Sequence, residues 1–307
     1  LNRIRIDRAT FARIMSRLAP QAEAAAAAED RYRFQYAIAL LRLDKFAAAR
    51  AMLAAPFIPP VAMMADPVRS LLAARPESFW LRPDRIEDDR MRDVMGARVD
   101  EPRATFVITT GVFFGFLPTG MIDAILAGHA VNRVYLRDFR KRAYCRGIAS
   151  LGADEAESLA GLRSLVGGLG ADRVMTLGSS LGGYGAFRIG ALFGAEAAVS
   201  LSGPSDPRLF YADTRNAVGN PAWFNKLTLD RDAGLETDLV PIVAAAGGTR
   251  FIQYYPEDNP SDRMQALRFA GTERVELRPI AGAGHHVIAN DMMADGRLDD
   301  LIEALLG

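Results

Sequence analysis

Residues 173–185 read Arg-Val-Met-Thr-Leu-Gly-Ser-Ser-Leu-Gly-Gly-Tyr-Gly, an apolar strand followed by a tight turn and the start of a helix. The turn is Gly-x-Ser-x-Gly centred on Ser180. Between a strand and a helix, such a turn holds its serine in a strained backbone conformation, with the hydroxyl exposed at the sheet edge. Gly178 and Gly182 leave out side chains that would collide where strand and helix cross. Ser180 is therefore the candidate nucleophile, in preference to Ser179, which is not centred between the two glycines.

From residue 104 onward, short apolar runs alternate with helical patterns, which predicts a mostly parallel sheet with helices on both faces. The expected strands are 104–110, 131–136, 174–177, 197–201, 251–255 and 275–279. The expected helices are 119–128, 154–169, 181–193, 238–246 and 262–269, followed by a helical C-terminus. Residues 96–307 are thus predicted to form one α/β domain.

Residues 1 to about 75 are predicted to be helical throughout. Ala24–Ala28 is a run of the strongest helix former, and apolar residues recur at helical spacing on both sides of the turn 43–45. This pair of helices resembles a tetratricopeptide-type unit at four positions, Tyr36, Ala37, Leu41 and Ala48. Only one unit is visible, so we expect a small helical-hairpin domain that could bind a protein partner.

Residues 56–103 are expected to connect the two parts, with the domain boundary near residue 95, which gives domains 1–95 and 96–307. Seven prolines, among them Pro67, are expected to interrupt any long element in this stretch. The charged run from Arg82 to Arg92 is expected to be a solvated surface.

The composition excludes several classes of partner. In 307 residues, Lys+Arg and Asp+Glu are both 37, so the net charge gives no reason to expect nucleic acid or an anionic membrane. No apolar run reaches the ~18 residues of a membrane span. The single cysteine, Cys145, cannot form an internal disulfide, which favours a reducing, cytoplasmic compartment. The start has no signal-peptide core and no methionine, so we expect a fragment or a processed product.

No cofactor or metal is expected, because no Cys/His/Asp/Glu cluster has metal-ligand spacing and the glycine-rich segment 167–170 follows a helix instead of preceding one.

A serine hydroxyl needs an adjacent base, and the chain has three histidines. His129 ends a helix, where a histidine commonly caps the carboxyl end. His285 and His286 lie in a glycine-rich loop just after the last strand, at the sheet edge where ligands gather in parallel sheets. His285 is the preferred base, because His286 is expected to begin the next helix.

The acid that orients the base is expected after the strand 251–255. Asp258 lies about three residues past the strand, and Asp262 lies just before a helical pattern, where it could instead be a simple N-cap. Spacing does not separate the two, and Glu257 is a weaker third candidate. The order serine, acid, histidine is the order of an α/β-hydrolase sheet.

The oxyanion that forms during acyl transfer needs two backbone N–H donors. The amide of Leu181, at the start of the helix, is one candidate. The loop after strand 104–110 offers the second, from Gly111, Val112 or Phe113.

Residues 96–307 resemble the α/β-hydrolase superfamily, and within it an esterase-like bacterial subgroup that carries helical repeats ahead of the hydrolase domain. The residues that carry the likeness are Val134–Asp138, Tyr144 with Gly147, Gly178–Gly185 and Gly284–Val287. The resemblance implies a serine esterase site and slightly favours Asp262 as the acid. The chain lacks the His-Gly-Gly-Gly segment of lipase-type relatives.

The sequence thus predicts a serine hydrolase of the esterase or thioesterase type, acting on a small-molecule or acyl-sugar ester through an acyl-enzyme. An acyltransferase that passes the acyl group to a sugar or other alcohol would use the same residues. A third alternative is a binding module in which the hydrolase fold is only a scaffold.

Overall fold

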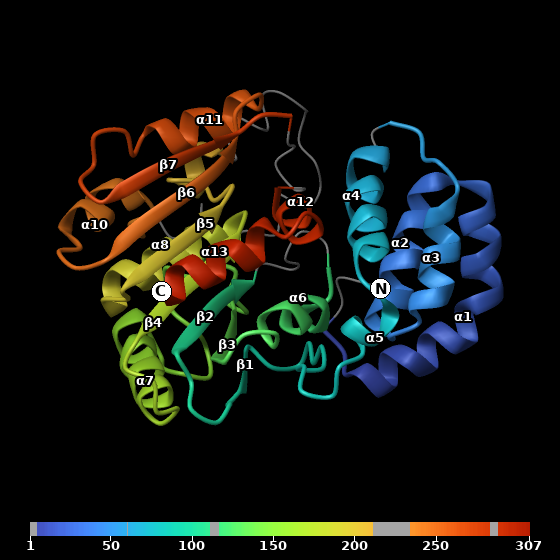
Figure 1. Ribbon diagram of the computed structural model, residues 1–307, viewed down its shortest axis with the longest axis horizontal. Coiled ribbons are helices and arrows are strands. Elements are labelled where there is room, and N and C mark those ends of the chain that lie inside the picture. The colour runs from blue at the N-terminus through green and yellow to red at the C-terminus, as the bar shows by residue number, and fades with distance from the viewer. Residues whose placement is uncertain (1–4, 60, 111–116, 211–233, 283–287) are drawn as a thin grey trace.

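The computed structural model describes residues 5–59, 61–110, 117–210, 234–282 and 288–307 (Figure 1). Seven strands form one sheet in the order β1-β3-β2-β4-β5-β6-β7, and only β1 runs antiparallel to its neighbour. The strands are β1 (Val94–Ala97), β2 (Ala104–Thr110), β3 (Val131–Arg137), β4 (Val174–Ser179), β5 (Ala197–Leu201), β6 (Arg250–Pro256) and β7 (Val275–Ile280). The six predicted strands are confirmed within two residues at each end.

Strand β1 is an element that the sequence analysis missed. It is only four residues long, and Gly96 and Ala97 make up half of it, so its own sequence carries little strand signal. Its position comes from pairing with β3, in the register Met95 opposite Tyr135. An edge strand of this kind is specified by its neighbour.

Helices cover both faces of the sheet. The first face carries α7 (Glu155–Gly167), α8 (Leu181–Phe193), α10 (Leu239–Ala245) and α11 (Pro260–Leu267), and the second carries α6 (Thr119–Leu126), α12 (Ile288–Ala294) and α13 (Arg297–Leu306). Every residue of β2, β3, β4 and β5 is buried, as expected for parallel strands between two helical layers. This is the α/β-hydrolase fold that the sequence predicted.

The N-terminal region is helical, as predicted, and packs beside α6 and α12 (Figure 1). It consists of α1 (Arg8–Ala28), α2 (Asp30–Arg42), α3 (Phe46–Ala54), α4 (Val61–Ala74) and the short α5 (Glu77–Trp80). Buried side chains of α2, α3 and α4 belong to the same hydrophobic cluster as the second face of the sheet. The boundary near residue 95 and the tetratricopeptide-like nature of the helices stay predictions.

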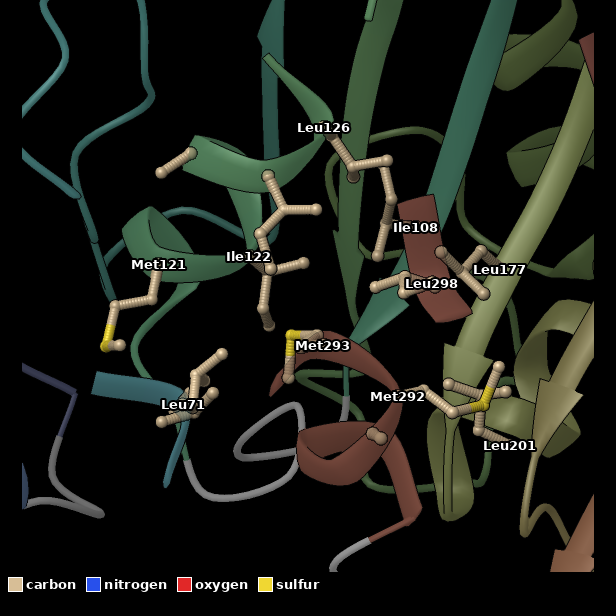
Figure 2. Packing of buried hydrophobic residues seen from close by; sticks show 14 of the residues in the cluster. Leu71, Ile108, Met121, Ile122, Leu126, Leu177, Leu201, Met292, Met293 and Leu298 are labelled. Atoms are coloured by element: carbon tan, nitrogen blue, oxygen red, sulfur yellow. The ribbon is translucent and has the colours of Figure 1, made fainter. Parts of the chain in front are cut away.

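Figure 2 shows where the helical region meets the sheet. Leu71 of α4, Ile122 of α6 and Met293 of α12 converge there, and Met292 and Leu177 continue the cluster toward β4. The helical region and the sheet therefore share one hydrophobic cluster. Burial of its apolar surface stabilises the folded chain by about 25 cal/mol per Å².

Pro67 does not interrupt a helix, contrary to the expectation that the prolines of residues 56–103 break up any long element. It lies inside α4, which runs from Val61 to Ala74. A proline in a helix removes one backbone hydrogen bond and crowds the preceding turn. Here Ala65, Val68 and Leu71 are completely buried around it, and their packing outweighs the local cost.

Most residues of the charged stretch 82–92 are partly or fully exposed, as expected for a solvated surface, but Asp88 and Arg90 are buried. Asp88 is only 3% exposed and forms ion pairs with Arg137 at 2.7 Å, Arg90 at 3.1 Å and Arg42 at 3.4 Å. Burial alone would raise the pKa of Asp88, but the three guanidinium groups hold that pKa below its usual value. The stretch joins α2 to the end of β3 through buried charges.

Of the helices in the part of the chain that the structure describes, none has the length and apolar character that a membrane span requires.

His129 has a structural role, though not the one expected. Its ring is not a helix cap but lies between two carboxylates of α13, with Nδ1 2.6 Å from Glu303 and Nε2 3.3 Å from Asp299. The hydrogen bond to Asp299, assisted by Glu303, raises the pKa of His129 above its usual value. Both ring nitrogens can donate only when the ring is an imidazolium.

We predict that the stabilising effect of His129 is lost as the pH rises. Because the pKa of the folded state is raised above the unfolded value of about 6.5, the contribution is fully present below about pH 6.5 and disappears as the pH passes the folded pKa. Urea unfolding of the wild type and His129→Gln should therefore differ more at about pH 5.5 than at about pH 9.

Arg103→Gln is the matched control, because Arg103 binds the same Glu303 at 2.9 Å and an arginine guanidinium carries a permanent charge in proteins. Its effect should be independent of pH. A pH-independent effect of His129→Gln would contradict the imidazolium assignment.

Candidate active site

Ser180 occupies the turn between β4 and α8 in the conformation that the sequence predicted. Its backbone has φ 54° and ψ −125°, a region that costs a residue other than glycine about 1–3 kcal/mol. The Ser180 amide donates to the Leu201 carbonyl of the neighbouring strand at 2.8 Å, which holds the turn in place. Ser180 is partly exposed, whereas Ser179 is 3% exposed within β4.

The glycines of the turn are required by close contacts. A Cβ atom on Gly178 would lie 2.1 Å from the Gly182 carbonyl oxygen and 2.5 Å from Thr109 Oγ1. A Cβ atom on Gly185, one turn along α8, would lie 2.6 Å from the ring of Tyr144. Strand and helix therefore approach more closely here than any side chain would allow.

Leu181 is the first residue of α8, so its amide has no acceptor within the helix. This leaves the predicted oxyanion donor at the carboxyl-terminal edge of the sheet, directly after Ser180. The other candidate donors, Gly111, Val112 and Phe113, lie outside the described residues. The structure shows the two ends from which their loop departs, Thr110 at the end of β2 and the buried Leu117.

Asp258 is exposed, and its carboxylate already has a structural partner. Oδ2 accepts a hydrogen bond from the Gly282 amide at 2.7 Å. A second bond, from the Glu257 amide to the Ile280 carbonyl at 2.9 Å, joins the same two segments. Asp258 therefore fastens the end of β7, where the histidine loop begins, to the loop after β6. Glu257 is also exposed.

Asp262 is 4% exposed and lies in the first turn of α11. The simple N-cap interpretation of this residue is wrong. The cap is Asn259, whose Oδ1 accepts from the amides of Ser261 at 3.1 Å and Asp262 at 3.3 Å. Pro260 suits the first helical position, so the helix begins two residues earlier than its apolar pattern indicates. Asn259, and not Asp262, is therefore the N-cap residue of α11.

His285 and His286 lie outside the described residues. The segments around them are placed, because β7 ends at Ile280 beside β6 and the chain re-enters the core at Ile288, the first residue of α12. The loop that carries both histidines therefore begins at the same sheet edge as Ser180 and the two aspartates. In the described part of the chain, no group of three or more potential metal ligands lies together.

Comparison with solved structures finds proteins of similar fold at low identity. The chain is similar to a carboxylesterase of the thaumarchaeon Nitrososphaera gargenis, with 12% identity over 69% of this chain and 94% of that one and a TM-score of 0.46. A capsule O-acetyltransferase of Neisseria meningitidis serogroup A shares 12% identity over 70% and 91%, with a TM-score of 0.48. Esterase B from Lactobacillus rhamnosis shares 14% identity over 81% and 97%, with a TM-score of 0.47.

No protein-family model matches the chain, and no curated protein sequence matches it. A functional proposal therefore has to rest on the residues of this chain.

We predict that Gly178→Ala disrupts the turn. The added methyl group would meet the backbone of Gly182 at 2.1 Å, so α8 must move away from β4, at a cost of about 1–3 kcal/mol or more. The free energy of unfolding in urea measures this cost. Gly167→Ala is the control, because a Cβ atom at Gly167, the last residue of α7, meets nothing within 4 Å. That variant should be neutral or up to about 1 kcal/mol more stable, and equal losses would contradict the contact argument.

Proposed function

We propose that the chain is a serine hydrolase that cleaves carboxylic esters or thioesters and forms an acyl-enzyme on Ser180. The observation that carries the proposal is the conformation of Ser180, φ 54° and ψ −125°, at the carboxyl-terminal edge of the central strand β4. Strain of this kind persists only where the surrounding structure maintains it, and it is concentrated at functional sites. A serine in such a turn is expected to present its side chain above the sheet, next to the amide of the following residue, here Leu181.

The proposed reaction begins with proton transfer from the Ser180 hydroxyl to His285 as the oxygen attacks the substrate carbonyl carbon. The carbonyl π electrons move to oxygen and form a tetrahedral oxyanion. Its collapse breaks the bond to the leaving alcohol or thiol, which takes the proton from His285. Water then attacks the acyl-enzyme by the same route and releases the acid and free Ser180.

We assign the orienting acid to Asp262 in preference to Asp258. A carboxylate that stabilises an imidazolium acts more strongly when it is shielded from water, and Asp262 is 4% exposed whereas Asp258 is exposed. Asp258 is also engaged by the Gly282 amide, which gives it a structural role at the start of the histidine loop.

The oxyanion is proposed to bind the amide of Leu181 and one amide from Gly111–Phe113. The first lies at the N-terminus of α8, where the helix dipole also favours negative charge. The second would come from the loop after β2. Strand β2 pairs with β4, the strand that leads to Ser180. A small-molecule or acyl-sugar ester is the substrate class that we propose for this site.

We predict that a fluorophosphonate probe labels Ser180. The probe forms a covalent bond only with an activated serine, so labelling should disappear in Ser180→Ala. Ser179→Ala is the control, because Ser179 is buried in β4 and should not be needed for labelling. Mass spectrometry of the labelled peptide identifies the serine. Absence of label on the wild type, or equal label on Ser180→Ala, would overturn the proposal.

We predict that Asp262→Asn lowers kcat by about 10⁴-fold, because an amide cannot stabilise the imidazolium. Asp258→Asn keeps an oxygen that can accept from the Gly282 amide, so its loss should be far smaller. Ester hydrolysis by the two purified variants, with thermal unfolding measured in parallel, separates the two aspartates. A larger loss in Asp258→Asn would transfer the role to that residue.

A further inference from the structure

Gln265 joins the helix that carries the proposed acid to the loop that follows β5. It lies on the buried side of α11 together with Asp262, three residues earlier. Its side-chain oxygen accepts hydrogen bonds from the Ser205 amide at 3.0 Å, from the Ser205 hydroxyl at 2.7 Å and from the Asp206 amide at 3.0 Å. Ser205 is completely buried. One amide oxygen thus binds three donors of a loop that is 60 residues away in the chain.

The loop after β5 also holds the turn of the proposed nucleophile. The Leu201 carbonyl, at the end of β5, accepts from the Ser180 amide at 2.8 Å. The next amide, that of Ser202, donates to the Tyr254 carbonyl of β6 at 2.9 Å. Every residue from there to Ser205 is buried. A short buried segment therefore connects the tie on Ser180 with the tie on α11.

We infer that Gln265 is a positioning residue that fixes the first turn of α11, and with it Asp262, relative to the turn of Ser180. The inference rests on the proposed function, in which Asp262 is the acid. Side chains three residues apart in a helix lie on the same face, so a movement of Gln265 away from the loop moves Asp262 with it. Gln265 contacts no reacting atom in this assignment and acts through the helix backbone.

Loss of the side-chain oxygen would leave three donors of the loop without their acceptor. Gln265→Met keeps an unbranched side chain and offers only a weak sulfur acceptor. Buried donors without an acceptor are costly, so the loop and α11 must separate enough to admit water. A displacement of about 1 Å, even away from the reacting atoms, can cost about 10²-fold in rate.

A second tie keeps α11 in place when Gln265 is changed. Arg268, just after the helix, donates to the Ser205 hydroxyl at 3.1 Å and to the Asp238 carboxylate at 2.6 Å. We therefore expect the helix of Gln265→Met to stay folded against the sheet, with its first turn displaced.

Asn132 provides the matched control. It is another completely buried amide side chain, and its oxygen accepts from the Val99 amide at 3.0 Å. It is the second residue of β3, which runs parallel to β2 and β4, so it lies at the opposite edge of the sheet from Ser180. Asn132→Leu removes the same kind of buried hydrogen bond at a place that holds neither α11 nor the loop after β5.

The experiment measures ester hydrolysis and thermal unfolding of Gln265→Met, Gln265→Glu and Asn132→Leu. We expect Gln265→Met to lower kcat by about 10²-fold with little change in KM, because the acid does not bind the substrate. Gln265→Glu keeps an oxygen that can accept from the loop and should retain most of kcat. Asn132→Leu should lose thermal stability and keep kcat.

Gln265→Met in the Asp262→Asn background separates positioning from a general effect on folding. Residues that act as a unit are not additive, so Gln265→Met should lower kcat much less in this background than in the wild type. Wild-type kcat in Gln265→Met, the same fold loss in both backgrounds, or an equal loss in Asn132→Leu would overturn the inference.

Ser205→Ala gives the answer if Gln265→Met does not fold. It removes one of the three donors and leaves both backbone bonds to Gln265. Its kcat should fall, by less than 10²-fold, and only when Asp262 is present; an unchanged kcat would overturn the inference. Failure of the proposed function would be seen separately, as no transfer of the fluorophosphonate probe to Ser180 in the wild type, and failure of the acid assignment as wild-type kcat in Asp262→Asn.

Discussion

The close crossing of β4 and α8 is the constraint on which the rest of the site depends. The Gly182 carbonyl oxygen lies 2.1 Å from where a Cβ atom of Gly178 would be, and Thr109 donates to that same carbonyl. The crossing turns the chain so sharply that Ser180 must take a positive φ. The strain of about 1–3 kcal/mol is offset by the burial of β4 between two helical layers.

The sheet edge at which this crossing ends is held by bonds between consecutive loops. Ser180 is tied to β5 through the Leu201 carbonyl, and Ser202, just after β5, donates from its amide to the Tyr254 carbonyl of β6. Asp258 then ties the loop after β6 to Gly282 after β7. Side chains separated by about a hundred residues in the chain thus start from neighbouring points of one edge.

A buried carboxylate attaches the segment between α5 and β1 to α6 and β3. Asp123 of α6 pairs with Arg133 of β3 at 2.8 Å and also accepts from the Tyr135 hydroxyl at 2.9 Å and the Ile86 amide at 2.5 Å. Such a pair is weak evidence for added stability, but loss of one partner would leave an uncompensated charge in the core. The segment between α5 and β1 is therefore attached to β3 at a defined position.

The sequence alone predicted the six parallel strands, the turn around Ser180 and the helical N-terminal region. Continuous apolar runs, glycine spacing and helical periodicity are local signals, and each of these elements is determined by its own residues. They also sufficed to prefer Ser180 over Ser179, because only Ser180 is centred between glycines that the crossing requires.

Tertiary structure decided what depends on a distant neighbour. Strand β1 exists through pairing with β3, and α4 continues through Pro67 because its apolar face is buried. Asp88 lies inside, within an otherwise largely exposed stretch, because it meets three arginines. The two aspartates after β6 look equivalent along the chain. They differ in the fold, because Asp262 is buried in the first turn of α11, which begins at Pro260, while the exposed Asp258 accepts from the Gly282 amide just after β7. Burial and partners are properties of the folded chain, and spacing in the sequence does not contain them.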